Sequence, residues 1–180
     1  MILNERDNRT VAIQQAATEI MTAARTAPKG KGVDILEIAT LTGEDLLPIA
    51  AEMRRISEET GFKFFLRDAD NVELADAVLF IGTHDHPHGL NCGQCGFAVC
   101  ADRTAGVPCA INTVDVGIAF GSACSKAADL RIDTRIMMSA GLAAQRLGVL
   151  GECRQVFAML MSIGSKNPFF DRKPKEEPQQ

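Results

Sequence analysis

Four cysteines lie close together in the middle of the sequence, and their spacing limits the fold more than any other feature. They are Cys92, Cys95, Cys100 and Cys109, in the pattern Cys-x2-Cys-x4-Cys-x8-Cys. Four thiolates on so short a tether can surround one small object, and the objects that most often require four are a metal ion and an iron–sulfur cluster. Gly and Pro are frequent around them, so we expect an irregular loop over 83–110 inserted between regular elements.

A four-iron four-sulfur cluster bound by all four cysteines is the favoured interpretation. The Cys-x2-Cys pair can wrap two corners of the cluster, and Gly93 and Gly96 permit positive φ and let backbone N–H groups approach its sulfurs. Structural zinc is the alternative, although zinc sites usually draw on two separated cysteine pairs, and unconnected thiols are a third interpretation. Cys124 is the rival of Cys109 as fourth ligand, and the proline before Cys109 favours the loop position. Cys124 and Cys153 otherwise fit buried structural thiols.

Length and composition predict one globular domain over 1–180. Hydrophobic residues make up 46% of the 180 residues and charged residues 23%, which is ordinary for such a domain. The net charge of −4 gives no electrostatic footprint for nucleic acid. No run approaches the ~20 apolar residues that span a bilayer, and the N-terminus lacks the apolar stretch of a signal peptide. We therefore expect a cytoplasmic protein with no membrane partner, in which cysteines stay reduced.

Hydrophobic periodicity predicts an α+β fold, with a small mixed or antiparallel sheet packed by helices and the cysteine loop inserted after the third strand. Helices are expected over 7–27, from about 47 to 60 with Pro48 in the first turn and Gly61 as the stop, over 111–130 and over 133–147. Strands are expected over 33–40, 62–67, 77–82 and 156–163. The charged, proline-containing tail at 173–180 is expected to be mobile.

Three glycines lie within the last two predicted helices and lower helix propensity there. Close approach of another element, or a flat ligand against the backbone, would offset that cost. These glycines are Gly117, Gly121 and Gly141.

All three histidines precede the cysteines, and three aspartates are spaced through the helical sequence that follows. The histidines allow a second metal site, but an exposed loop that merely contains histidines is more common, so they are left unassigned. The aspartates are interpreted as helix caps or partners of Arg131 and Arg135. These residues are His84, His86 and His88, and Asp115, Asp129 and Asp133.

The cysteine segment carries a family resemblance. The run CGQCGFAVC over 92–100 resembles the four-iron four-sulfur domain of corrinoid iron–sulfur proteins and electron-transport subunits, although the fourth cysteine of that domain lies further along than Cys109. Segments 86–92, 108–110 and 164–173 are similar to an uncharacterised prokaryotic family described only as containing a ferredoxin domain. This resemblance is nearly full length, and it implies a cluster without implying a reaction.

A weaker resemblance is to the nitroreductases, which bind FMN at a dimer interface. It rests on segments 23–32, 115–121 and 156–172, which follow the same order in that family. The paired arginines and serine of the nitroreductase flavin site are reduced here to Arg6 and Arg9, and a lysine at 29 replaces the usual serine. The resemblance implies a homodimer and FMN. Residues that could supply positive charge to its phosphate, or could simply be solvated surface charges, are Lys29, Lys31, Lys166 and Arg172.

Together these features predict a redox protein that passes single electrons through a four-iron four-sulfur cluster. The expected electron partner is a bound flavin that reduces a small-molecule acceptor, or another protein. The alternative is a non-enzymatic iron–sulfur sensor or a structural zinc module. Substrate and electron donor do not follow from the sequence.

Overall fold

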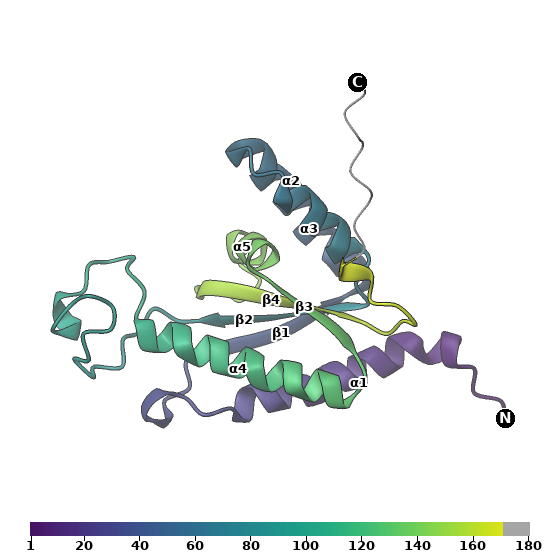
Figure 1. The fold of residues 1–180 in the computed structure, drawn as a ribbon, viewed down its shortest axis with the longest axis horizontal. Helices are drawn as coiled ribbons and strands as arrows, with labels where there is room; N and C mark the ends of the chain where they lie inside the picture. Colours follow the sequence, from purple (N-terminus) through teal and green to yellow (C-terminus); the bar gives the residue numbers. More distant parts are fainter. Residues whose placement is uncertain (171–180) are drawn as a thin grey trace, which may run out of the picture.

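The computed structural model describes residues 1–170 and shows a four-stranded antiparallel sheet between two layers of helices (Figure 1). The strands are β1 (Leu36–Thr42), β2 (Ala77–Thr83), β3 (Asp133–Met137) and β4 (Arg154–Ser162), in the spatial order β1-β2-β4-β3. Each neighbouring pair is antiparallel. This architecture agrees with the predicted α+β class and makes the sheet antiparallel throughout the described residues.

The two helical layers cover opposite faces of the sheet (Figure 1). Helices α1 (Glu5–Thr26) and α4 (Ala110–Asp129) pack on one face, and α2 (Leu47–Thr60), α3 (Phe64–Glu73) and α5 (Met138–Arg146) pack on the other. Every residue of β2 is buried, because both faces of this central strand are covered. Its uninterrupted apolar sequence follows from that position, since a strand buried on both faces has no polar side.

Several predicted elements are confirmed close to their expected boundaries. The helix expected over 7–27 is α1, and the helix expected from about 47 to 60 is α2, with Pro48 in its first turn. Gly61 ends α2 at a φ of 75°, a left-handed conformation that glycine adopts without a Cβ penalty. The helix expected over 111–130 is α4, and the strands over 77–82 and 156–163 are β2 and β4.

The strand predicted over 62–67 is wrong, because this segment begins helix α3. Only Phe65 is buried within the apolar run, and Ala69 and Val72 continue its buried face at helical spacing. Phe62 and Phe64 stay exposed. The local run of apolar and aromatic residues favours a strand, whereas burial against α2 and the sheet selects the helical period of 3.6.

The single helix predicted over 133–147 is also wrong, because strand β3 and helix α5 divide this segment. Arg131 has a positive φ of 61° at the end of α4, which turns the chain back toward the sheet. The next residues then pair with β4 as an edge strand. Pairing with a distant strand decided this segment, and no local pattern of hydrophobic residues encodes that contact.

The cysteine loop follows the second strand and not the third, since the strand expected at 62–67 does not form. It joins β2 to α4 and contains one short 3-10 turn, η3 (Cys100–Asp102). The other 3-10 turns are η1 (Gly30–Gly32), η2 (Gly43–Leu46) and η4 (Pro168–Phe170). The tail predicted to be mobile, 173–180, lies outside the described residues.

Gly141 accounts for one of the three unusual helical glycines. A Cβ placed there would lie 2.1 Å from the carbonyl oxygen of Val156 and 2.5 Å from the Cα of Phe157 in β4. Helix α5 therefore approaches the sheet backbone too closely for any side chain. Gly117 and Gly121 face open space on α4.

Among residues 1–170, no helix combines the length and the apolar character that crossing a membrane requires.

Candidate functional site

The cysteine loop projects beyond one end of the sheet, next to the N-terminus of α4 (Figure 1). Nearly all residues between Gly89 and Pro108 are exposed or half-buried. Packing therefore does little to fix the outer part of this loop, and its shape depends on turns and hydrogen bonds within it.

Two local interactions order the loop around three of the predicted ligands. The Gly96 N–H donates to the Gly93 carbonyl at 2.9 Å, and φ values of 70° and 89° at these glycines close a tight turn around Cys95. Cys100 is tied to Asn91, the neighbour of Cys92, because the Cys100 N–H donates to Asn91 Oδ1 at 2.8 Å. The Asn91 N–H in turn lies 3.3 Å from Cys100 Sγ. Backbone donors to sulfur are the interactions that stabilise and tune bound clusters.

Cys109 lies at the other end of the loop, where it is the buried N-cap residue of α4. Its rival Cys124 lies 15 residues further along the same helix, or about 22 Å along the axis. Cys124 Sγ is 3.4 Å from the sulfur of Met159 in the core between α4 and the sheet. The structure thus separates Cys124 from the cysteine loop and leaves Cys109 beside it.

Cys124 and Cys153 both have the character of structural thiols. Burial raises the pKa of each thiol, which disfavours the thiolate that a metal requires. Their burial agrees with the interpretation of these two cysteines as packing residues.

The donor set of the loop fits an iron–sulfur cluster in its chemistry. Four thiols can ligate such a cluster, and the two glycines at positive φ and the N–H directed at sulfur are compatible with it. Within residues 1–170, no three cysteine, histidine or carboxylate side chains converge as a metal site. The residues that would hold a cluster, Cys92, Cys95, Cys100 and Cys109, stay a prediction that rests on their spacing and thiol chemistry.

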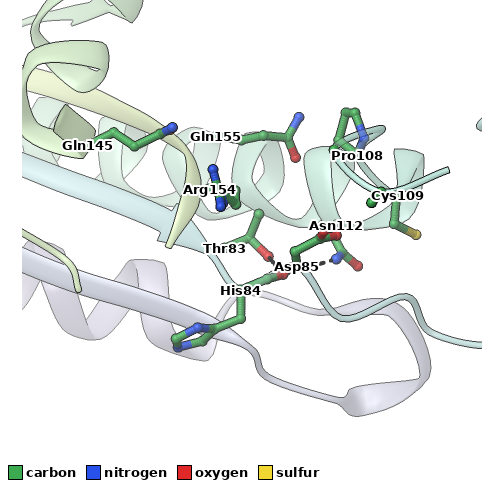
Figure 2. Close-up of a pocket in the computed structure, with 11 residues that line it drawn as sticks. Thr83, His84, Asp85, Pro108, Cys109, Asn112, Gln145, Arg154 and Gln155 are labelled. Atoms are coloured by element: carbon green, nitrogen blue, oxygen red, sulfur yellow. Dashed lines mark hydrogen bonds between the residues drawn. The ribbon is translucent and has the colours of Figure 1, made fainter. Parts of the chain in front are cut away.

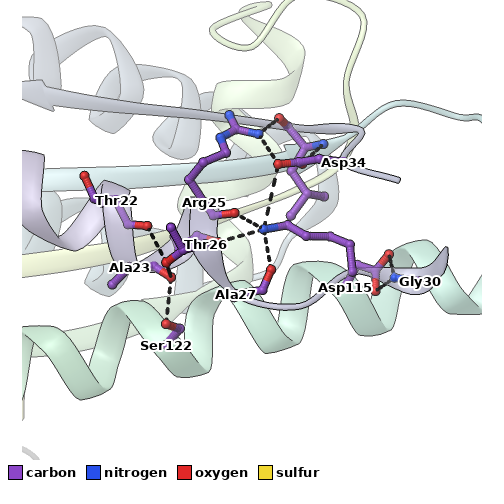
Figure 3. Close-up of polar contacts among 12 residues, drawn as sticks. Thr22, Ala23, Arg25, Thr26, Ala27, Gly30, Asp34, Asp115 and Ser122 are labelled. Atoms are coloured by element: carbon purple, nitrogen blue, oxygen red, sulfur yellow. Dashed lines mark hydrogen bonds and ion pairs between the residues drawn. The ribbon is translucent and has the colours of Figure 1, made fainter. Parts of the chain in front are cut away.

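A buried polar network anchors the start of the loop to the scaffold. His88 Nε2 lies 3.1 Å from Asp115 Oδ2, and both side chains are almost completely buried. The Gly30 N–H donates to both oxygens of Asp115 at 2.9 and 3.1 Å (Figure 3), and Lys31 Nζ donates to the His88 carbonyl at 3.0 Å. His88 Nδ1 is buried with no partner among the described residues. The network joins the loop, α4 and η1 at one point.

Asn112 provides a second anchor, one turn before Asp115 on α4. Its Nδ2 group donates to the carbonyls of His84 at 3.3 Å and His86 at 3.0 Å. An ion pair of 2.7 Å between Asp85 and Arg103 then joins the two arms of the loop. The base of the loop is thus held by specific contacts, in contrast to its exposed outer part.

The three histidines differ in role. Only His88 belongs to the buried network; His84 pairs with Glu37 at 3.3 Å on the surface, and the His86 side chain is exposed. Asp115 was expected to cap a helix or pair with arginine, and that interpretation is wrong. A carboxylate in a largely apolar stretch of helix indicates a buried polar contact. The sequence does not identify the partner, because His88 is 27 residues away.

Lys29 closes the C-terminus of α1. Its side chain is only 4% exposed, and Nζ donates to the carbonyls of Ala24 at 3.0 Å, Ala27 at 2.8 Å and Arg25. Burial lowers the pKa of this ammonium. The carboxylate of Asp34, 3.8 Å away, acts in the opposite direction but has the smaller effect. Figure 3 shows the Arg25–Asp34 pair beside this helix end. The Lys29 ammonium, which was a candidate to bind a phosphate, is therefore already bonded to the carbonyls at the end of α1.

Two of the predicted phosphate ligands, Lys31 and Lys166, lie at opposite ends of the sheet. Lys31 contacts His88 at the end of the sheet that carries the cysteine loop. Lys166 follows β4 at the opposite end, and the nine residues of β4 span about 27 Å. Arg172 lies outside the described residues. Arg9, one of the two arginines compared with the flavin site, pairs with Glu5 on the exposed first turns of α1.

Comparison with known sequences identifies the family. Residues 105–172 match the family described as "Uncharacterized protein containing a ferredoxin domain", a segment that includes Cys109 and begins after Cys100. A protein of Archaeoglobus fulgidus, described as "Uncharacterized protein", is 42% identical over 186 aligned residues, covering 98% of this chain and all of the relative. The chain belongs to this ferredoxin-domain family.

Solved structures show that this member of the family has the nitroreductase fold. A nitroreductase with bound FMN from Desulfitobacterium hafniense superposes with a TM-score of 0.59 at 16% identity, covering 92% of this chain and 87% of that one. A nitroreductase described as putative, in complex with FMN, from a Desulfovibrio desulfuricans subspecies gives 0.56 at 14% identity, covering 92% and 86%. A BluB-like flavoprotein from Clostridium difficile gives 0.54 at 16% identity, covering 91% and 85%. The shared feature is the fold.

Proposed function

We propose that the protein is an iron–sulfur redox protein in which Cys92, Cys95, Cys100 and Cys109 hold one four-iron four-sulfur cluster. The observation that carries the proposal is the local order of the loop: a tight turn closes around Cys95, Asn91 bonds to Cys100, and Cys109 lies at the N-terminus of α4. The family description supports an iron–sulfur centre. When bound, such a cluster supplies one electron at a time, and an FMN would couple that electron flow to two-electron reduction of a small acceptor.

The residues of this chain contribute position and electrostatics to that chemistry. Asn91 directs its N–H at Cys100 Sγ, an interaction that favours the reduced, more negative state of a bound cluster. The contacts of His88 and Asn112 hold the base of the loop against α4. The N-terminus of α4 places partial positive charge beside Cys109.

FMN binding is the finer part of the proposal, and it requires a second copy of the chain. The candidate residues Lys31 and Lys166 lie at opposite ends of the sheet, so one protomer cannot place both on one phosphate. A homodimer could bring these ends together. The exposed stripe on α4 formed by Val114, Gly117, Ile118 and Gly121 is a face suited to such an interface.

Anaerobic purification followed by iron, sulfide and zinc analysis tests the cluster. We expect about four irons per chain and a visible charge-transfer absorbance that disappears in Cys92→Ser, Cys95→Ser and Cys100→Ser. Cys124→Ser is the matched control and should keep full iron content, because Cys124 packs in the core away from the loop. Stoichiometric zinc without iron would instead establish a structural zinc module.

The flavin and dimer are tested separately. FMN titration monitored by flavin fluorescence should saturate at one FMN per chain, and light scattering should give the mass of a dimer. Lys31→Gln and Lys166→Gln should each weaken FMN binding, whereas the capping role of Lys29 predicts that Lys29→Gln lowers stability more than affinity. Absence of saturable FMN binding by a dimeric protein would leave an electron carrier without flavin.

A further inference from the structure

A cavity of about 480 Å³ lies between the end of β2, the start of β4 and the N-terminus of α4. Cys109 forms part of its wall, so the cavity adjoins the cysteine loop. Figure 2 shows side chains from three elements around it, with Thr83 on β2, Arg154 and Gln155 on β4 and Asn112 on α4. This volume is in the range that binds small organic ligands.

Two features give the cavity positive potential. Arg154 is exposed at the start of β4, and its guanidinium makes no ion pair with any residue in 1–170. Helix α4 is 20 residues long, begins beside the cavity at Cys109, and has neither a side-chain cap nor an acidic residue in its first turn. The N–H groups of this first turn have no intrahelical partners. Asp85 also lines the cavity, but Arg103 neutralises its carboxylate at 2.7 Å.

Asn112 supplies the observation that points to a ligand. Its side chain is 1% exposed, and its two Nδ2 hydrogen bonds to loop carbonyls fix which way the amide faces. Oδ1 then has no hydrogen-bond partner among the described residues. A buried acceptor without a donor costs free energy, so a bound molecule that supplies a donor to Oδ1 would recover that cost.

Gln155 adds a preorganised amide to the opposite wall. It occupies a β-bulge in the β2–β4 pairing with a φ of 48°, a conformation that non-glycine residues seldom adopt. Its carboxamide exchanges hydrogen bonds with the Thr113 hydroxyl at 2.8 and 3.0 Å. These bonds hold the side chain over the first turn of α4.

We propose that this cavity binds a small carboxylic acid that also carries a hydroxyl or amine donor. The carboxylate faces Arg154 and the first-turn N–H groups of α4, because a planar guanidinium matches a carboxylate in a bidentate geometry. The donor group satisfies Asn112 Oδ1. Binding requires neither iron nor flavin, so the test of this site is independent of the proposed redox centre. Its position beside Cys109 would nevertheless place the acid near a cluster.

Malate and succinate form a matched pair of probes, since they differ by one hydroxyl. Calorimetric titration of the protein as isolated should show saturable malate binding, with succinate several times weaker because it cannot donate to Asn112. Arg154→Gln should weaken malate binding by about tenfold or more, the usual effect of removing a charged hydrogen bond. Ala105→Phe fills the cavity without changing charge and should abolish binding.

Arg131→Gln is the charge-matched control, because Arg131 lies at the far end of α4 and should leave affinity within twofold. Amide chemical shifts should change at Ala110, Ile111 and Asn112, which form the first turn. No saturable binding of malate, equal affinity for the two acids, or binding that survives both Arg154→Gln and Ala105→Phe would each overturn the proposal. Binding of inorganic phosphate alone would overturn the assignment of a carboxylic acid.

Discussion

The buried contact between His88 and Asp115 yields the most stringent prediction for the scaffold of the cysteine loop. Replacing Asp115 by alanine removes the acceptor for the Gly30 N–H at 2.9 Å and for the His88 ring at 3.1 Å. The buried His88 ring and the half-buried Gly30 N–H would then both lack this partner. Each unsatisfied buried group costs about 1–3 kcal/mol, so Asp115→Ala should lower the free energy of unfolding by roughly 3–5 kcal/mol.

Asp115→Asn keeps the shape of the side chain and removes one of its two acceptor oxygens. The amide oxygen can still accept from Gly30, but only one acceptor remains for two donors, so a loss of about 1–2 kcal/mol is expected. Asp129→Asn is the control on the same helix, since Asp129 is exposed and its replacement should change stability by less than about 0.5 kcal/mol.

Thermal unfolding followed by circular dichroism measures these differences. A chain of 180 residues shifts its Tm by roughly 2–4 °C per kcal/mol, so Asp115→Ala should unfold at least about 6 °C below wild type. Hydrogen exchange should accelerate over 84–90 more than in β2, because the base of the loop loses its anchor. If Asp115→Ala unfolds within about 1 °C of Asp129→Asn, the network does not stabilise the fold and the argument from buried partners fails.

Other substitutions test the close packing and the electrostatics of the scaffold. Gly141→Ala should destabilise the protein by more than about 2 kcal/mol in urea unfolding, because its Cβ would overlap the carbonyl of Val156, whereas Gly117→Ala faces open space and should stabilise α4 by about 0.5–1 kcal/mol. Equal effects at the two glycines would contradict the close approach of α5. Hydrogen bonds from Arg55 hold the pKa of Glu52 below its usual range. The unfolded state therefore takes up the proton first as pH falls, so the stability from Glu52 is complete above about pH 4.3 and is lost at lower pH, through the folded-state pKa. Glu52→Gln should flatten the pH dependence of Tm in that range, and an unchanged acid limb would count against this contribution.

Sequence patterns predicted the parts of the fold whose cause is local. The four-cysteine spacing identified the loop, Pro48 and Gly61 marked the ends of α2, and the continuous apolar run at 77–82 identified a buried strand. In each case the residue type that fixes the backbone lies within or next to the element it defines. Backbone conformation and side-chain periodicity are local properties, so the sequence alone was sufficient.

The tertiary structure decided what depends on distant partners. Edge strand β3 forms because it pairs with β4. Helix α3 forms because Phe65 packs in the core against α2. Lys29 is buried and donates to the carbonyls of α1, and the sequence does not distinguish this lysine from an exposed one.

Within the candidate site the same division holds. The sequence by itself predicted which residues would bind a cluster, because the spacing of the four cysteines sets both the thiol donors and the length of chain between them. Only the tertiary structure showed that Asp115 meets His88, that Cys124 is packed in the core away from the loop, and that a cavity opens between Arg154 and Asn112. These contacts join residues 27 to 42 positions apart, or belong to a helix and a sheet that meet only in the folded chain. Their free energy comes from burial and pairing of polar groups, which exist only after the chain has packed.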